Sequence, residues 1–201
     1  MKDRFIAIGD IHACNRPLRE ILAQCKEYPE HRIIFLGDYI DRGPDPGNVL
    51  HNIKRTDAVF LMGNHEAMMF DLVDICDNRE KALRFLGRRG LGYENYLWLR
   101  ENCIPFYETE EYIFSHAGLN PGRSLEEQEL ADYLWTFHRE EYHNTEKIVV
   151  HGHNSEEEIR IVGNNINVDT GCGKGGYLSA LVLPERIELR SKSRGRTLRR
   201  F

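Results

Sequence analysis

Three short polar segments near the start of the chain carry the side chains best suited to chemistry. Each follows an apolar run with the composition of a buried strand, and each delivers Asp, Asn or His where that strand would end. Because ligands gather at the carboxyl ends of parallel strands, we expect the three segments to meet at one edge of a sheet. The segments are Gly9-Asp10-Ile11-His12, Gly37-Asp38-Tyr39-Ile40-Asp41-Arg42-Gly43 and Gly63-Asn64-His65-Glu66.

These side chains, joined by two later histidines, form a donor set for divalent metal ions. Carboxylate, amide and imidazole donors suit Mn²⁺, iron or Zn²⁺ better than Ca²⁺. A carboxylate can bridge two ions about 3.5–4 Å apart, and Asp38 is the natural candidate for that role. Two cations that share a water lower its pKa, and the resulting hydroxide can attack phosphorus in line. The donor set, called the ligand cluster below, comprises Asp10, His12, Asp38, Asn64, His116 and His153.

Length and composition predict a soluble enzyme-sized domain. The 201 residues suit one domain, residues 1–201, with a sizeable core. No apolar run approaches the ~20 residues that span a bilayer, and residues 1–4 lead straight into a strand without a secretory signal. Five cysteines without a CxxC spacing favour free thiols over disulfides or a thiolate metal site. We therefore expect a cytoplasmic protein that makes no membrane contact.

The net charge of −5 is unevenly distributed along the chain. Residues 186–201 contain seven basic side chains and one acidic side chain, so the remainder is strongly acidic. An acidic body argues against a broad nucleic-acid surface. The basic C-terminal segment 186–201 could bind nucleic acid or an acidic partner, but a solvated last strand with a frayed terminus is the simpler interpretation.

The hydrophobic pattern indicates how the polar segments are positioned. Alternating strands and helices in the first third, with helices at 16–28 and 46–55, predict a parallel sheet covered on both faces. Residues 67–103 have a helical pattern interrupted by glycines, which predicts several short helices forming a cap. A further helix is expected over 124–143. Alternating apolar residues beyond residue 156 predict a second, mostly antiparallel sheet.

Taken together, these motifs resemble the metallophosphoesterase (calcineurin-like) superfamily, and within it the bacterial-type phosphoprotein phosphatases. The likeness runs from residue 5 to about residue 183 and includes Ser115-His116-Ala117-Gly118-Leu119 and Val149-Val150-His151-Gly152-His153. The segment Asn167-Val168-Asp169-Thr170-Gly171-Cys172 also matches bacterial members. The resemblance implies an α/β fold: a four-layer sandwich of two mixed β-sheets flanked by helices, with a small helical cap.

The resemblance also implies how the ligand cluster divides between two metal ions. The expected ions are Mn²⁺, with iron, Zn²⁺ or Ni²⁺ as alternatives. His151 competes with His153 for one ligand place, and the Gly-His step of the family favours His153. Asp10 and His12 would hold the first ion, Asp38 would bridge, and Asn64, His116 and His153 would hold the second.

The remaining roles implied by the resemblance concern the substrate. His65 would be the general acid for the leaving oxygen, with Asp41 orienting it and stabilising its charged form. Arg42 would bind phosphate oxygens through its bidentate fork, assisted by Asn64. A second phosphate-binding arginine would be Arg139, if two residues are inserted after the Leu-Trp step; the alternative is an ordinary surface arginine.

One departure from the family pattern lies inside the first segment. The family usually has glycine after the first histidine, whereas this chain has Ala13. The added methyl group could narrow the approach to the first metal, although it removes no ligand. A glycine-rich loop at residues 171–176 has neither the spacing nor the following helix of a phosphate-binding loop, so a turn between strands is expected there.

The leading functional prediction is a binuclear metal-dependent phosphatase acting on phosphoserine or phosphothreonine in proteins, with phosphotyrosine or a small phosphoester as further substrates. The main alternative is a diadenosine-tetraphosphate-type hydrolase. Symmetrical dinucleotide hydrolases commonly lack the Asp before Arg-Gly and carry Asp after Asn-His, where this chain has Asp41 and Glu66. Two further alternatives are a nucleic-acid phosphatase or phosphodiesterase and a metal-binding pseudo-phosphatase.

Overall fold

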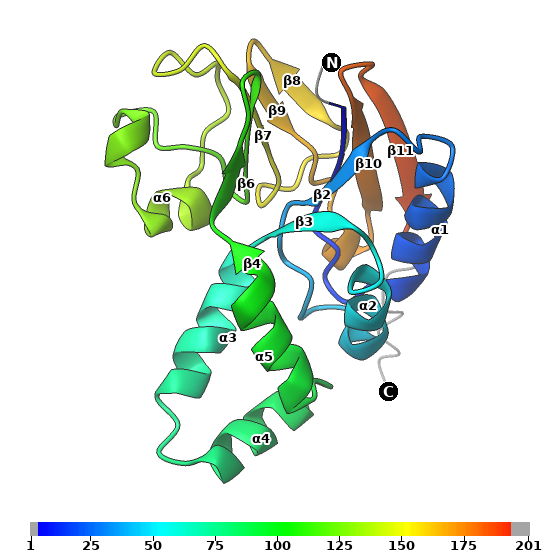
Figure 1. Ribbon diagram of the computed structural model, residues 1–201, viewed down its shortest axis with the longest axis vertical. Helices are drawn as coiled ribbons and strands as arrows, with labels where there is room; N and C mark the ends of the chain where they lie inside the picture. The colour runs from blue at the N-terminus through cyan, green and yellow to red at the C-terminus, as the bar shows by residue number, and fades with distance from the viewer. Residues whose placement is uncertain (1–3, 194–201) are drawn as a thin grey trace, which may run out of the picture.

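Two β-sheets stack face to face in the computed structural model, which describes residues 4–193 (Figure 1). Both sheets mix parallel and antiparallel strand pairs, as predicted. The first sheet has the order β11 (Ile187–Lys192), β10 (Tyr177–Leu183), β1 (Phe5–Ile8), β2 (Arg32–Phe35), β3 (Ala58–Leu61) and β4 (Cys103–Ile104). The second has the order β5 (Phe106–Glu108), β6 (Tyr112–Ser115), β7 (Ile148–His151), β9 (Asn165–Asn167) and β8 (Arg160–Val162).

Helices connect and cover these strands, which confirms the expected α/β class. Parallel strands β1, β2 and β3 are joined by α1 (Asn15–Cys25) and α2 (Pro46–Ile53), whose apolar faces pack on the first sheet. The predicted cap consists of α3 (Asn64–Asp74), α4 (Arg79–Arg88) and α5 (Tyr93–Asn102), which project away from the sheets in the lower part of Figure 1. Outside the second sheet lie a short 3₁₀ turn (Leu125–Glu127) and α6 (Leu130–Trp135).

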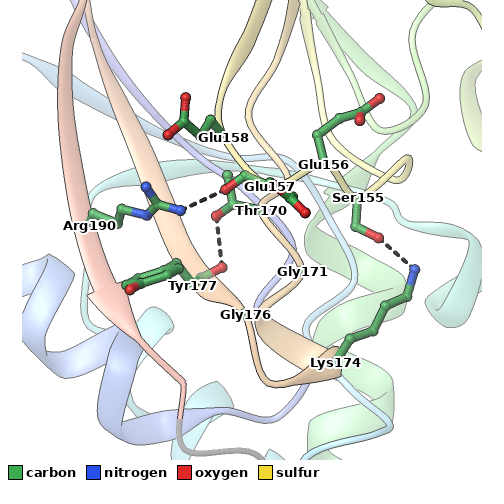
Figure 2. A pocket seen from close by; sticks show the side chains of 10 residues that line it. All are labelled: Ser155, Glu156, Glu157, Glu158, Thr170, Gly171, Lys174, Gly176, Tyr177 and Arg190. Carbon is green, nitrogen blue, oxygen red and sulfur yellow. Dashed lines mark hydrogen bonds between the residues drawn. The ribbon is translucent and has the colours of Figure 1, made fainter.

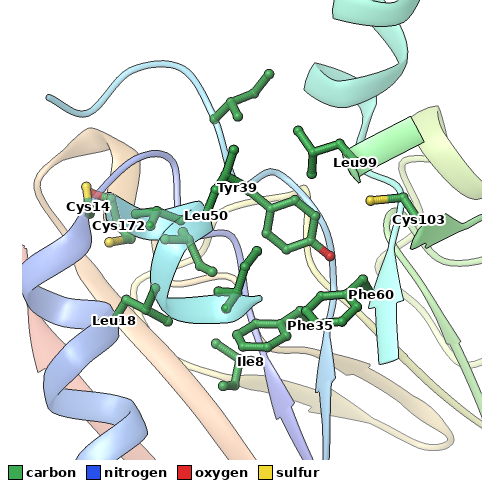
Figure 3. Close-up of a cluster of buried hydrophobic side chains, with 14 of the residues drawn as sticks. Ile8, Cys14, Leu18, Phe35, Tyr39, Leu50, Phe60, Leu99, Cys103 and Cys172 are labelled. Carbon is green, nitrogen blue, oxygen red and sulfur yellow. The ribbon is translucent and has the colours of Figure 1, made fainter. Parts of the chain in front are cut away.

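Three apolar layers hold the sandwich together. Strand β1 serves two of them, because Phe5 and Ala7 face the second sheet while Ile6 and Ile8 face the helices. On the helical side, the rings of Phe35 and Phe60 stack with centroids 5.5 Å apart (Figure 3). The third layer lies between the second sheet and α6. Burial on both faces explains why the strands of the first third are continuously apolar.

The last two strands differ from the prediction. The sequence pattern placed them in the second sheet, but β10 pairs antiparallel with β1, and β11 pairs with β10, in the first sheet. An alternating pattern shows that one face of a strand is buried, but it does not identify the partner strand. Since β1 is fully buried, its backbone groups need hydrogen-bond partners on both edges, and β10 supplies the second edge.

The prediction of a helix over 124–143 is also wrong for the residues beyond 135. Helix α6 ends at Trp135, and residues 136–143 form an irregular loop. Two asparagine side chains at the start of β9 and just before it provide hydrogen bonds for the backbone of that loop. Asn165 donates to the carbonyl of Glu140 at 2.7 Å, and Asn164 accepts from the Tyr142 amide at 2.8 Å. These long-range bonds replace the local bonds of a helix.

The C-terminal part of the chain is described only in part. Strand β11 contains two of the basic residues of segment 186–201, Arg190 and Lys192, and both lie over the ring of Tyr177. Residues 194–201 lie outside the described part. All five cysteines are free thiols. Among the described residues, no helix combines the length and apolar character needed to cross a membrane.

The layer between the two sheets gives a test of the packing. Phe114 is fully buried and its ring contacts Phe5 at 5.1 Å between centroids. We expect Phe114→Ala to lower the free energy of unfolding by about 3–5 kcal/mol, because the deletion leaves a cavity that the two sheets cannot close. Urea denaturation measures the change. Ile75→Ala, at a side chain that is 74% exposed, is the control and should stay within about 0.5 kcal/mol of wild type. A loss below about 1 kcal/mol at Phe114 would contradict this packing.

Candidate metal centre

The three polar segments meet at the carboxyl ends of β1, β2 and β3, as the sequence predicts. The first two segments are joined directly, because the amides of Ile11 and His12 both donate to the carbonyl of Asp38, at 3.2 and 2.8 Å. Adjacent parallel strands therefore bring side chains that are distant in the sequence to one edge of the sheet.

The carboxylate of Glu66 fixes the backbone of the loops that carry the polar segments. Glu66 is fully buried, and its two oxygens accept from the amides of Asp38 at 2.8 Å, Tyr39 at 2.9 Å, Gly63 at 3.1 Å and Ile40 at 3.3 Å. Burial and the nearby Asp38 raise the pKa of Glu66 to about 8, and the backbone donors oppose that shift. Glu66 thus ties the loop after β2 to the loop after β3.

Several side chains at the site lie on backbone that is left-handed. The φ angles are +48° at His12, +54° at Ala13, +54° at Asp38 and +68° at His153. Such angles are costly for residues other than glycine, and they cluster at functional sites where the fold imposes them. The left-handed angle of Ala13 explains physically why glycine suits that position. The Ala13 methyl group is buried rather than directed at an open metal approach, and its amide donates to the carbonyl of Tyr39 at 2.8 Å.

All six residues of the ligand cluster come together, with Asp38 at the centre. Its Oδ2 lies 3.4 Å from His12 Nε2, and its Oδ1 lies 3.6 Å from His116 Nε2. The two oxygens of Asp38 therefore face two different sets of donors, which is the arrangement of a bridging carboxylate. Asp10 Oδ2 completes one set at 4.0 Å from His12 Nε2.

The other set gathers around His116. His116 Nε2 lies 3.0 Å from Asn64 Oδ1 and 3.2 Å from His153 Nδ1. Ligands about 2.0–2.2 Å from a common ion lie roughly 3–3.5 Å from one another, so these separations fit one coordination shell. Two orientations of the Asn64 amide suit this cluster: its oxygen points to a cation, or its nitrogen donates to His116 Nε2 at 3.0 Å.

Backbone carbonyls orient two of the imidazoles as ligands. His12 Nδ1 lies 3.1 Å from the carbonyl of Ile40, and His116 Nδ1 lies 2.9 Å from the carbonyl of Leu36. A proton on each Nδ1 donates to that carbonyl, which leaves Nε2 as a lone-pair donor for a metal. Burial lowers the pKa to about 4 for His12 and about 3 for His116, so no proton competes with a cation at neutral pH.

Two observations show that the cluster suits cations. His12 Nε2 is buried and has no hydrogen-bond partner among the described residues. Burial, together with the neighbouring carboxylates of Asp169 and Asp38, raises the pKa of Asp10 well above its ordinary range. Buried carboxylates of the same charge are compatible with one another when positive ions lie among them. The donors therefore fit divalent metal ions.

Asp169 is a residue of the site to which sequence reasoning gave no role. It follows β9, is buried, and has a pKa raised to about 6, chiefly by burial. Its Oδ1 accepts from the Gly171 amide at 2.9 Å, which holds the carboxylate beside Asp10. The available signal was the matching segment 167–172, in which Asp169 closely follows a short strand that alternates asparagine with apolar residues.

The pair formed by His65 and Asp41 is present at the edge of the cluster. His65 Nδ1 lies 2.7 Å from Asp41 Oδ2, and this hydrogen bond lowers the pKa of Asp41. His65 Nε2 points to the cluster, 3.9 Å from Asp38 Oδ2 and 3.3 Å from Arg42 Nη2. The sequence did not indicate Arg89 from the end of α4, whose Nε lies 3.4 Å from Asp41 Oδ1.

His151 and Arg139 lie differently from the ligands. His151 is buried, with Nε2 at 2.7 Å from Asn165 Oδ1 and Nδ1 at 3.0 Å from the carbonyl of Gly152, so both its nitrogens already face oxygens. The contacts of the Arg139 guanidinium are with Glu156 at 3.2 Å and with the ring of Phe137. A phosphate-binding role for Arg139 stays a prediction, because both of these contacts are with residues outside the ligand cluster.

The glycine-rich loop 171–176 covers the cluster rather than cradling a phosphate. A Cβ atom at Gly173 would lie 2.6 Å from the His12 ring, so only glycine allows this close approach. Lys174, from the same loop, donates to Ser155 Oγ (Figure 2). The loop and the segment after His153 line a surface pocket that also contains Tyr177 and Arg190.

Comparison with known proteins agrees with this geometry. The family model described as calcineurin-like phosphoesterase matches residues 3–179. An asymmetrical bis(5'-nucleosyl)-tetraphosphatase, PrpE of Oceanobacillus iheyensis, is 23% identical, and the alignment covers 89% of this chain and 88% of that protein. A symmetrical bis(5'-nucleosyl)-tetraphosphatase of Nitrosospira multiformis is 28% identical over 62% of this chain and 46% of its own length. A crystal structure of a protein described provisionally as a diadenosine tetraphosphatase has a TM-score of 0.76 and 24% identity, with 96% and 95% of the two chains covered.

Metal binding should release protons from carboxyl groups, not from histidines. Near pH 6 Asp169 is partly protonated in the metal-free chain, because burial raises its pKa to about 6, and burial beside Asp169 and Asp38 raises the pKa of Asp10 as well, whereas His12 and His116 are already neutral. A cation favours the ionised carboxylates. Calorimetric titration with Mn²⁺ at pH 6 in two buffers of different ionisation enthalpy should therefore show proton release.

Two comparisons sharpen that measurement. Asp169→Asn should release fewer protons than wild type, and the share due to Asp169 should disappear as the pH rises above its pKa of about 6. Equal binding enthalpies in the two buffers, or proton uptake, would contradict the protonation states described here.

Proposed function

The chain belongs to the calcineurin-like phosphoesterase family, and on that premise we propose that it hydrolyses dinucleoside tetraphosphates asymmetrically, giving a nucleoside triphosphate and a nucleoside monophosphate. The observation that carries the proposal is the likeness to an asymmetrical bis(5'-nucleosyl)-tetraphosphatase over nearly the whole of both chains. A second such protein, from Halalkalibacterium halodurans, is 25% identical over 90% of this chain and 91% of its own length.

This proposal departs from the leading sequence prediction of a protein phosphatase. That prediction relied on Asp41 and Glu66, which differ from the usual residues of symmetrical dinucleotide hydrolases. The difference argues against symmetrical cleavage, but it does not bear on asymmetrical cleavage of the same substrates. The full-length likeness therefore supports the nucleotide alternative over a protein substrate.

Each part of the site has a task in this reaction. Two divalent cations in the ligand cluster, for which we propose Mn²⁺, would activate a water and neutralise charge on the attacked phosphate. Arg42 is exposed beside His65 and can present its planar fork to phosphate oxygens. His65 Nε2 is placed to protonate the leaving oxygen, while Asp41 holds the ring through Nδ1 and stabilises the imidazolium.

The same parts can serve phosphomonoester hydrolysis, so a protein phosphatase is the second candidate. The observation that favours it is the 2.7 Å contact between His65 and Asp41, because an acid held in this way is most useful for a poor leaving group such as a serine alkoxide. The triphosphate or monophosphate released from a dinucleotide leaves more easily and needs less protonation.

A substrate comparison tests the proposal. With Mn²⁺ present, diadenosine tetraphosphate should show the highest kcat/KM among dinucleotide, phosphoserine peptide and 5'-phosphorylated oligonucleotide. Chromatography of the products should show ATP and AMP in equal amounts. Formation of two molecules of ADP per dinucleotide would show symmetrical cleavage and contradict the proposal. A higher kcat/KM for the phosphopeptide would instead favour a protein phosphatase.

The acid role of His65 gives a separate prediction. His65→Asn should retain two metal ions, since His65 is not one of the six proposed ligands, and should lower kcat by about 10²–10⁴. The loss should be larger for an alkyl phosphate than for p-nitrophenyl phosphate, whose leaving group needs no proton. His51→Asn, at an exposed histidine on α2, is the control and should be unchanged. An equal loss for both leaving groups would rule out proton donation by His65.

A further inference from the structure

We propose that a cavity between α3 and α6 binds one nucleoside of the substrate, with the base stacked on Trp135. The cavity has a volume of about 610 Å³ and is walled on one side by α3 of the cap and on the other by α6. This inference rests on the proposed function, because it names the place where the dinucleotide extends beyond the phosphates. The residues that carry the argument are Met68, Asp71, Asp74, Arg100, Leu134 and Trp135.

Two walls of the cavity adjoin the candidate metal centre. The Trp135 ring lies 6.0 Å from the ring of the ligand His153, and α3 starts with the ligand Asn64. The wall formed by α3 runs from Ala67 to Asp74, a length of about 10 Å at 1.5 Å per residue. A nucleoside attached to a phosphate at the ligand cluster therefore has room to lie along α3.

The walls have the chemistry of a base site. Met68, Leu134 and Trp135 provide apolar surface, and Trp135 keeps 50% of its surface exposed although it is the largest side chain type. Its ring stands nearly perpendicular to the ring of His153, at an interplanar angle of 87°, so the two rings do not stack on each other. Stacking of a base on an aromatic face contributes about 1–3 kcal/mol and tolerates any base.

The charges of the cavity walls indicate which part of the substrate binds there. Asp71 and Asp74 line the outer part of the cavity, and the one guanidinium there, that of Arg100, is paired with Asp74 at 2.7 Å. An acidic wall disfavours phosphate, but its carboxylates can accept from ribose hydroxyls or from an amino group of a base. Phosphates then belong at Arg42 and the cations, and the nucleoside belongs in the cavity.

The neighbouring pocket beyond His153 lacks a comparable platform. Its aromatic residue, Tyr177, is covered by the guanidinium of Arg190 at 3.8 Å from the ring centroid (Figure 2). The ammonium of Lys192 lies 4.3 Å from the same centroid. Three consecutive glutamates, Glu156 to Glu158, also line that pocket. The side with α3 and α6 is therefore the side that suits a base.

Fluorescence can test the stacking without turnover. The chain has two tryptophans, Trp98 and Trp135. Trp98 lies in α5 against Phe60 and outside the cavity, so Trp98→Phe leaves Trp135 as the only reporter. Adenosine and AMP should quench Trp135 emission saturably, and ribose 5-phosphate, which lacks a base, should not. The reciprocal variant Trp135→Phe should show no saturable quenching.

The outcomes of the titration divide cleanly. Saturable quenching by adenosine in Trp98→Phe but not in Trp135→Phe supports the proposal. Absence of saturable quenching, equal quenching in both variants, or quenching by a phosphoserine peptide but not by adenosine would overturn it. The last result would assign the cavity to a peptide.

Steady-state kinetics separate this inference from the proposed function. Trp135→Ala should raise KM for diadenosine tetraphosphate about tenfold or more relative to KM for p-nitrophenyl phosphate, which has no nucleoside. Leu72→Ala, an exposed residue of α3 that does not line the cavity, is the matched control and should leave both values unchanged. Wild-type protein that fails to hydrolyse the dinucleotide contradicts the proposed function. Wild-type hydrolysis combined with an unchanged KM in Trp135→Ala contradicts only the nucleoside site.

Discussion

The site depends on four hydrogen bonds that the buried carboxylate of Glu66 accepts from backbone amides. These amides belong to the loops after β2 and β3, the loops that carry Asp38 and Asn64. Positive φ angles at Asp38, Asp41 and Arg42 would otherwise be costly, and an external constraint must hold them. Because Glu66 lies two residues after Asn64 on α3, the same helix that carries the proposed metal ligand Asn64 also fixes the loop of Asp38, the proposed bridging ligand.

The second constraint is electrostatic, and it destabilises the site in the absence of cations, whereas the hydrogen bonds of Glu66 stabilise it. Asp10, Glu66 and Asp169 are buried together with Asp38 in one small region, and burial raises the pKa values of Asp10, Glu66 and Asp169. Burial lowers the pKa values of His12, His116 and His153, so these imidazoles are neutral and supply no compensating charge. The balance is restored when cations enter, which means that the fold is arranged for a charged occupant rather than for stability of the empty chain.

The sequence predicts those parts of the site that depend on local order along the chain. Asp10, Asp38 and Asn64 could be placed because each follows an apolar strand, and parallel strands end at one edge. Asp169 follows β9, which has the sequence Asn-Ile-Asn and belongs to the second sheet, so its closeness to Asp10 depends on how the two sheets stack, which alternation in the sequence does not encode. Arg89 and the loop 136–143 were missed for a related reason: their positions are set by Asp41 and by Asn164 and Asn165, which are distant in sequence.

The structure also shows why Glu66 cannot by itself decide between a protein and a nucleotide substrate. Its oxygens are occupied by backbone amides and are fully buried, so the side chain reaches no substrate. A shorter carboxylate there would change how the loops after β2 and β3 are held, and hence the placing of Asp38 and Asp41. The groups that act at phosphorus are thus held by buried contacts such as those of Glu66, which relatives with different substrates can share. Selection among substrates must come from surfaces that the leaving and non-leaving groups touch, and α3 and α6 supply the surface beside the ligands.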